Sequence, residues 1–268
     1  MGRHEFLVDR DSDPRRFERI KSRPAYEQVA EAIEQTILSG RLRPGDPVGT
    51  ESELVKRFGV NRSTVREGIR LLERSGLVTR EPSRRLSVAM PHYHRLSTRM
   101  TRALILQQVT FRELWHTSCA LEPATVALAL ENRTEADLAA LADNLEKTRA
   151  AASDPAAVAE LDAGFHKIIA QAAHNRIMLL AKEPTSILVA PVTAHIITHN
   201  PAGIPRLIKA HTHIAEAIRR RDKETALLWV DRHLRDWKAG FERSGFDLDS
   251  PVPAASIEST RGEPHRKS

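Results

Sequence analysis

Four side chains that can bind a divalent cation recur at spacings that would bring them together. Asp162 and His166 are four residues apart on a predicted helix, so their side chains point the same way and can share one ion. His211 lies 11 residues before an expected turn near Asp222, and His233 lies 11 residues after it. In an antiparallel helical hairpin these histidines stand level, about 16 Å from the turn. The pattern predicts one carboxylate and three imidazoles meeting inside a bundle.

The neighbours of both hairpin histidines indicate that they face the core. His211 shares a helical stripe with Ile214, and His233 shares one with Val230. Three imidazoles and a carboxylate suit Zn²⁺, with Ni²⁺, Mn²⁺ and Fe²⁺ as alternatives. Buried polar residues that hydrogen-bond one another are the other explanation, and the spacing alone leaves both open.

A second group of reactive side chains lies nearer the N-terminus. A predicted helix is capped by Asn61, and its first turn carries arginine and hydroxyl side chains. In a helix-turn-helix this turn enters the major groove, where arginine binds guanine and hydroxyls bind phosphates or base edges. The residues assigned to DNA, on this helix and on the hairpin after it, are Asn61, Arg62, Ser63, Thr64, Arg66, Arg70, Arg84 and Arg85.

The spacing of apolar residues and the positions of helix-ending residues predict the helices and strands that carry the DNA-binding residues. Val29, Ile33 and Ile37 indicate a helix that ends at Gly40. A capping box, Thr50 with Glu53, begins the next helix, and the helix capped by Asn61 ends at Gly76. Short strands are expected at 77–79 and 86–88. The order helix, helix, tight turn, helix, hairpin is that of a winged helix-turn-helix.

The rest of the chain predicts a mainly α protein. Long Ala/Leu/Glu-rich segments with breaks near Asn132, Asn175 and Asp222 indicate a bundle of six or seven helices. The expected organisation begins with a mobile N-terminal arm (1–22), a winged helix-turn-helix domain (23–89) and a linker (90–97). A helical effector-binding and dimerisation domain (98–245) and a disordered tail (246–268) follow.

Composition is that of a globular protein in a reducing compartment. The 268 residues are 41% hydrophobic and 28% charged, and the single cysteine excludes a disulfide framework within the chain. The strongest apolar run, 187–197, is too short to span a membrane, and the charged N-terminus does not fit a signal peptide. Residues 1–95 carry 19 Lys and Arg against 14 Asp and Glu, which favours a polyanionic partner there. We therefore expect a soluble cytoplasmic protein with no membrane partner.

A long motif runs through the N-terminal region: Gly45-Asp46, Glu51-Ser52-Glu53-Leu54, Phe58-Gly59-Val60-Asn61-Arg62-Ser63-Thr64-Val65-Arg66-Glu67 and Leu72-Glu73-Arg74-Ser75-Gly76-Leu77-Val78. It resembles the GntR family of bacterial transcription regulators. The resemblance implies a homodimer whose two winged domains read a palindromic operator in double-stranded DNA. Three positions depart from the family: Ser52 replaces the usual arginine, and Ser83 and Arg85 stand where the tip of the wing is commonly glycine-rich. The operator should therefore differ from the commonest ones of the family.

The C-terminal region carries Leu161-Asp162-x-x-Phe165-His166, His211-x-x-Ile214 and Arg232-His233-Leu234. These motifs resemble the all-helical effector-binding (FCD-type) domain of the FadR-type subfamily, which implies metal ligation by Asp162, His166, His211 and His233. Members commonly carry an arginine before a Leu-Glu-Pro motif to hold an acid effector, and Ser118 stands there. The effector is then neutral, or another cation substitutes; the candidates for lining its site are Arg102, Arg112, Ser118, His195 and His199.

Together these features predict a DNA-binding transcription regulator, a repressor, and not an enzyme. A small-molecule effector in a metal-containing helical domain would control its operator affinity. One alternative is a regulator for which the metal ion is itself the signal. The other is a metal-dependent hydrolase, which the absence of a paired base and the presence of a winged domain disfavour.

Overall fold

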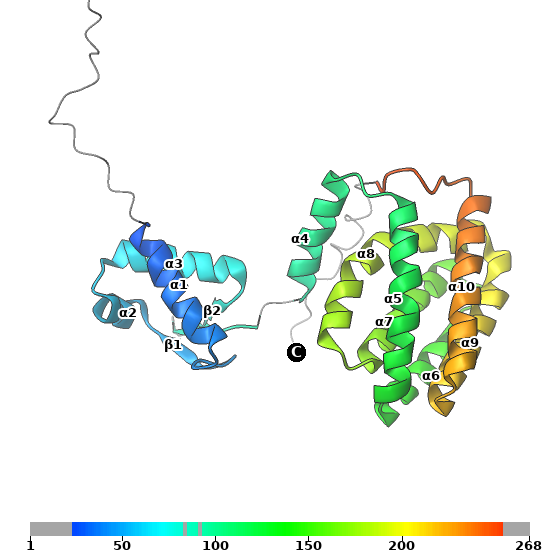
Figure 1. The fold of residues 1–268 in the computed structure, drawn as a ribbon, viewed down its shortest axis with the longest axis horizontal. Helices are drawn as coiled ribbons and strands as arrows, with labels where there is room; N and C mark the ends of the chain where they lie inside the picture. Colours follow the sequence, from blue (N-terminus) through cyan, green and yellow to red (C-terminus); the bar gives the residue numbers. More distant parts are fainter. Residues whose placement is uncertain (1–22, 83–84, 91–92, 254–268) are drawn as a thin grey trace, which may run out of the picture. The chain divides into compact units, whose positions relative to one another are not determined.

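The computed structural model describes residues 23–82, 85–90 and 93–253, which form two compact units that divide between residues 92 and 93 (Figure 1). The arm expected at 1–22 and the wing residue Arg84 lie outside the described residues. The mainly α fold predicted from the sequence is confirmed, with ten α-helices and one small sheet in the described part of the chain.

The N-terminal unit is a winged helix-turn-helix, as predicted. Helices α1 (Ala25–Leu38), α2 (Glu51–Phe58) and α3 (Arg62–Ser75) pack beside a sheet whose strand order is β1-β3-β2. The strands β2 (Val78–Arg80) and β3 (Leu86–Val88) pair antiparallel as the predicted hairpin. Strand β1 (Pro47–Gly49) was not predicted, because three residues bounded by proline and glycine give no alternating pattern.

Caps and one close contact fix the helices of this unit. Thr50 and Glu53 form the predicted capping box of α2, and the Asn61 side chain accepts a hydrogen bond from the Thr64 amide at the start of α3. Gly68 allows α3 to approach α1, because a Cβ at this position would lie 2.9 Å from the Tyr26 carbonyl oxygen. The first turn of α3 is thereby presented from a fixed framework.

The C-terminal unit is a bundle of seven α-helices, within the predicted range. They are α4 (Tyr93–Leu106), α5 (Phe111–Asn132), α6 (Glu135–Ala150), α7 (Pro155–Ala172), α8 (Arg176–His199), α9 (Ile204–Arg220) and α10 (Lys223–Arg243), with a 3₁₀ turn, η1 (Pro201–Gly203), before α9. Helices α9 and α10 form an antiparallel hairpin, and α5 runs beside α10 (Figure 1).

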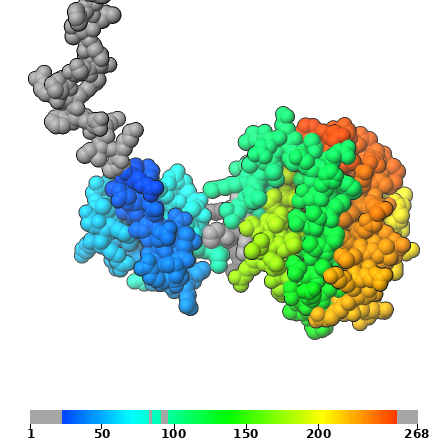
Figure 2. All heavy atoms as spheres, viewed as in Figure 1, coloured from blue at the N-terminus to red at the C-terminus, as the bar shows by residue number. Residues whose placement is uncertain are grey.

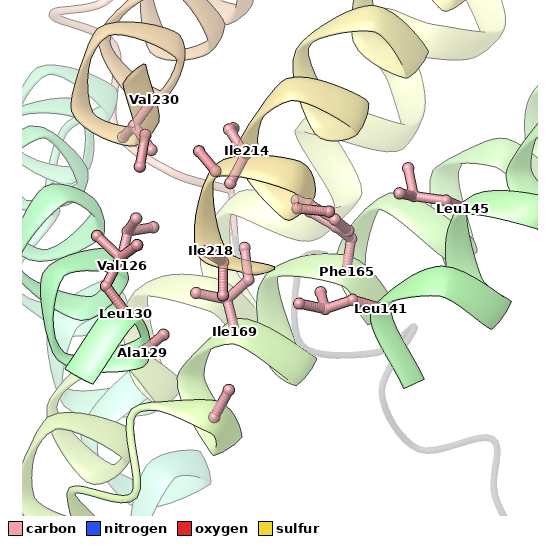
Figure 3. Packing of buried hydrophobic residues seen from close by; sticks show 14 residues of the cluster. Val126, Ala129, Leu130, Leu141, Leu145, Phe165, Ile169, Ile214, Ile218 and Val230 are labelled. Carbon is pink, nitrogen blue, oxygen red and sulfur yellow. The ribbon is translucent and has the colours of Figure 1, made fainter. Parts of the chain in front are cut away.

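The main core of the bundle joins α5, α6, α7, α9 and α10 around Phe165, Ile169, Ile214 and Ile218 (Figure 3). Phe165 and Ile218 are fully buried, so α7 and α9 are held against each other by a close-packed contact. The polar residues between these helices are therefore positioned by rigid elements.

Two expected boundaries differ from the structure. Helix α4 begins at Tyr93, inside the linker expected at 90–97. The tail expected to be disordered from 246 packs on the bundle as far as 253: Leu248 and Val252 are buried, and the Leu248 carbonyl accepts a hydrogen bond from the Arg112 amide at 2.8 Å. In Figure 2 this segment lies in red-orange across the end of the bundle beside α5. The prediction failed because the polar composition of the segment outweighed Leu248 and Val252, the two apolar residues that attach it to the bundle.

Helix α8 begins directly after the predicted break near Asn175, and it is more apolar than expected. Its 24 residues have a mean hydropathy that meets the length and composition criteria for a membrane span, although Pro184 and Pro191 lie within it. The expectation that no apolar segment reaches that length was wrong, because only the run 187–197 was counted. In the bundle α8 packs against α7 and α4, and Leu188 is fully buried.

Candidate metal centre, ligand cavity and DNA-facing surface

The structure brings Asp162, His166, His211 and His233 together. Helix α7 supplies Asp162 and His166, α9 supplies His211, and α10 supplies His233. One possible ligand atom from each residue lies within 4.8 Å of the others. The level placement of His211 and His233 expected from the hairpin therefore occurs, and Asp162 and His211 are buried.

The distances within this cluster are those expected of ligands around one cation, and the shortest of them is also a hydrogen-bond distance. Nε2 of His166 lies 3.1 Å from Nε2 of His233, and Nε2 of His211 lies 3.4 Å from Oδ1 of Asp162. Within the described chain, Asp162 Oδ1 and both ring nitrogens of His211 are buried without a hydrogen-bond partner. Because buried polar atoms are nearly always partnered, this donor set is incomplete without a further group, and a divalent cation would complete it.

A carboxylate and a lysine support the cluster from outside. Glu122 Oε2 lies 3.4 Å from His166 Nδ1, and Glu122 Oε1 accepts a hydrogen bond from Lys182 Nζ at 2.7 Å. A carboxylate on one imidazole nitrogen directs the other nitrogen toward a metal and raises its basicity. Glu122 thus orients His166, and Lys182 anchors Glu122.

Burial and the local charges set the protonation states of the cluster. Burial holds the pKa of His211 well below its ordinary value and lowers the pKa of His233 to about 3, so both are neutral at neutral pH. Burial also disfavours the His166 imidazolium, but the Glu122 carboxylate outweighs it and raises the His166 pKa. Burial raises the pKa of Asp162. Neutral imidazoles are the form that binds metal.

A cavity of about 280 Å³ opens beside the cluster between α5, α7, α8 and α10. Asp162, His166 and His233 form part of its wall, and most of the rest is apolar. Ligand pockets are typically about 300–1,000 Å³ and mostly apolar, with a few polar groups that fix orientation. This cavity is therefore suited to one small molecule in contact with the metal cluster.

Of the five candidate effector-site residues, Ser118 lines this cavity. The other four lie outside its lining. Arg112 binds Asp249 through Nη2 at 2.8 Å, and Arg102 is exposed on α4. The rings of His195 and His199 stack on each other with centroids 3.7 Å apart. Residue type and approximate helix position do not fix which face a helix presents, so these four do not line this cavity, and their role in effector binding stays a prediction.

The sequence analysis missed four cavity residues: Trp115, Glu122, Lys182 and Trp237. No functional role was predicted for the two tryptophans, and Glu122 is the glutamate of the Leu-Glu-Pro motif, to which no role was assigned. No local pattern indicated that Lys182 is buried, because the residues that follow it, 183–186, are Glu-Pro-Thr-Ser. Lys182 is 5% exposed.

The predicted DNA-binding residues of α3 lie on the exposed surface of the winged unit. Arg62 and Arg66 are exposed, Ser63 donates a hydrogen bond to the Asn61 side chain, and Thr64 is half-buried. Arg62 Nη2 donates to Ser52 Oγ at 3.0 Å, which links the helix to the position where the family usually has arginine. Arg70 pairs with Glu67 on the same helix, and Arg85 is exposed at the hairpin.

Comparison with known protein families and structures supports both units. The family model "Bacterial regulatory proteins, gntR family" matches residues 25–88, and the model "FCD domain" matches residues 113–236. The chain is 28% identical to the Glc operon transcriptional activator of Escherichia coli K12 over 224 residues, covering 81% of this chain and 88% of the relative. It is 28% identical to the HTH-type transcriptional repressor NanR of Cronobacter sakazakii, covering 80% and 85%. The solved structure of Streptococcus agalactiae GntR has the same fold, with a TM-score of 0.53, 21% identity and coverage of 80% of this chain and 99% of that one.

Proposed function

Because this chain belongs to the GntR family of bacterial transcription regulators and joins its winged helix-turn-helix to an FCD domain, we propose that a small molecule bound beside a metal ion in the helical unit controls its affinity for an operator. The observation that carries the proposal is the cluster of Asp162, His166, His211 and His233 at the wall of the 280 Å³ cavity. FCD domains often bind metal ions, and this chain retains a complete set of candidate ligands.

Zinc is the proposed metal. Three neutral imidazoles and one carboxylate are typical zinc ligands, with Ni²⁺, Mn²⁺ and Fe²⁺ as competitors for the same set. Asp162 Oδ1 and one of the two orphaned ring nitrogens of His211 are atoms that such an ion would satisfy. A coordination position facing the cavity would be open to an oxygen of the effector.

The winged unit is proposed to read the operator. The first turn of α3, with Arg62, Ser63, Thr64 and Arg66, would enter the major groove, and Arg70, Arg84 and Arg85 would contact the backbone. Two copies of the chain would bind the two halves of a palindromic site. The named relatives include an activator and a repressor, and we propose repression here.

Control requires that the effector binds the two conformations of the dimer with different affinity. A repressor would lose operator affinity when the effector fills the cavity. The fold and the relatives are those of transcription regulators, so the hydrolase alternative is set aside. A regulator that senses the metal itself differs in one measurable way, because its operator affinity would follow the concentration of free metal.

Elemental analysis of the purified dimer tests the metal centre. The expected result is close to one zinc ion per chain in the wild type, and loss of that ion in Asp162→Ala and in His211→Ala. His213→Ala is the matched control, because this neighbouring histidine on α9 stacks on Trp229 away from the cluster. A metal-free wild type, or variants that keep their metal, would refute the assignment.

Operator binding is then measured by fluorescence anisotropy in zinc buffers that span free concentrations from picomolar to micromolar, on a DNA site selected from random sequences. Constant affinity across this range supports a small-molecule effector. Affinity that rises or falls with free zinc would instead identify the metal as the signal. Failure to select any palindromic site would contradict the DNA-binding proposal.

A further inference from the structure

The cavity contains a buried cation that is distinct from the proposed metal ligands. Lys182 on α8 is 5% exposed and lines the cavity wall. Its ammonium has three hydrogen-bond donors, and among the described residues its one hydrogen-bond partner is Glu122. A buried ammonium with two unused donors is costly unless another acceptor is present.

Further hydrogen-bond donors lie on the facing helix. Trp115, Ser118 and Glu122 are spaced i, i+3 and i+7 on α5, so they share one face, and all three line the cavity. Trp115 Nε1 is buried without a hydrogen-bond partner within the described chain. Because Glu122 binds Lys182, this face of α5 and Lys182 border the same region of the cavity.

The charges of the site favour a ligand with one negative charge. If a divalent ion occupies the cluster, the combined charge of the ion, Lys182 and the Asp162 and Glu122 carboxylates is about +1. Lys167 and Glu183, which also line the cavity, offset each other. An anion in a largely apolar cavity of this size is stable only where a cation compensates it.

We propose that Lys182 binds the acid group of the effector, and that the effector is a small molecule with a single negative charge. This inference rests on the proposed function, because it assigns a residue and a ligand class to the same cavity. Trp115 Nε1 and the Ser118 hydroxyl provide further donors, and the ligand's body would lie against the apolar wall.

Binding of matched acids and amides tests the proposal. Isothermal titration calorimetry on the purified dimer compares acetate, phenylacetate, benzoate and mandelate with acetamide, phenylacetamide, benzamide and mandelamide. We expect at least one acid to bind the wild type at least tenfold more tightly than its amide. Lys182→Met should reduce this acid preference about 10- to 100-fold, the range expected when a charge-assisted hydrogen bond is lost.

Three variants keep the result interpretable. Lys182→Arg should retain the acid preference because it keeps the cation. Glu122→Gln combined with Lys182→Met removes both charges of the pair, so loss of preference there cannot arise from an uncompensated Glu122. Lys223→Met removes an exposed cation of the helical unit that does not line the cavity, and it should leave the preference unchanged.

Two outcomes would overturn the inference: binding of none of the four acids, or an acid preference that survives in Lys182→Met and in the double variant. Zinc content and operator binding of each preparation are measured in parallel. A metal-free wild type that still shows a Lys182-dependent acid preference would refute the metal proposal and leave this inference standing. A wild type that binds zinc and DNA but shows no acid preference would refute this inference and leave the metal proposal standing.

Discussion

The imidazole of His211 stacks on the ring of Phe165, with centroids 3.8 Å apart and planes inclined by 10°. Both side chains are fully buried, and they come from the helices α9 and α7 that supply three of the four candidate ligands. Among the described residues the His211 ring has no hydrogen-bond partner, so the aromatic contact sets the orientation of the imidazole. The hydrophobic core and the candidate metal centre are therefore one packing unit.

Phe165→Leu should weaken zinc binding about tenfold, because groups that orient a metal ligand typically contribute 10- to 100-fold to affinity. Competition with a chromophoric chelator measures the zinc affinity. Phe111→Leu is the matched control: Phe111 is buried in a different cluster, so its loss should lower stability without changing zinc affinity. Equal zinc affinity in the wild type and Phe165→Leu would show that packing does not position His211.

Acid should destabilise the metal-free helical unit between about pH 6.5 and pH 5. The folded pKa values of His211 and His233 are depressed, so the unfolded chain binds more protons in this window and the free energy of unfolding falls with pH. His166 has a raised pKa, so it is protonated in both the folded and the unfolded state below about pH 6.5 and opposes the loss only near the upper end of the window. Each of the two depressed histidines therefore contributes up to about 1.4 kcal/mol per pH unit. Urea unfolding of chelator-treated protein measures this slope.

Tryptophan fluorescence makes the measurement specific, because all three tryptophans lie in the helical unit. His233→Leu should flatten the pH slope, since the unfolded chain then gains one proton fewer. Stability that is constant, or rises, on acidification over this window would contradict the depressed pKa values.

The sequence predicted those features of the site that depend on helical periodicity. Asp162 and His166 share a face because they are four residues apart, and the hairpin arithmetic placed His211 level with His233. Lys182 and Trp115 were missed because their role depends on which faces of α8 and α5 meet across the bundle, which no local pattern specifies. Packing of the segment after α10 depends in the same way on tertiary contacts at Leu248.

Leu248→Ala should lower the stability of the helical unit by about 2–3 kcal/mol, because it removes a buried side chain that packs in the cluster with Phe111 and Phe241. The urea midpoint, followed by tryptophan fluorescence, reports the change. Leu106→Ala is the control, since that side chain is 85% exposed and its truncation should alter stability by less than about 0.5 kcal/mol. A negligible effect at Leu248 would mean that the segment is detached in solution.

Arg85→Ala should reduce the salt dependence of operator binding, as expected for a wing that lies along the DNA backbone. Each lost phosphate contact lowers the slope of log affinity against log salt by about one. Arg84→Ala should act similarly, and Arg149→Ala, which removes the same charge from the helical unit, should leave the slope unchanged. An unchanged slope in both wing variants would exclude the wing from the interface.

Arg62→Ala should weaken binding to a selected operator about 10- to 100-fold, the cost of losing one arginine contact to a base. Ser52 accepts a hydrogen bond from the Arg62 guanidinium and restricts it, so Ser52→Ala should cost about two- to tenfold through added disorder of that side chain. A double-mutant cycle separates the two roles. If Ser52 acts through Arg62, Ser52→Ala has no further effect once Arg62 is alanine. Additive losses would instead show that Ser52 contacts DNA itself.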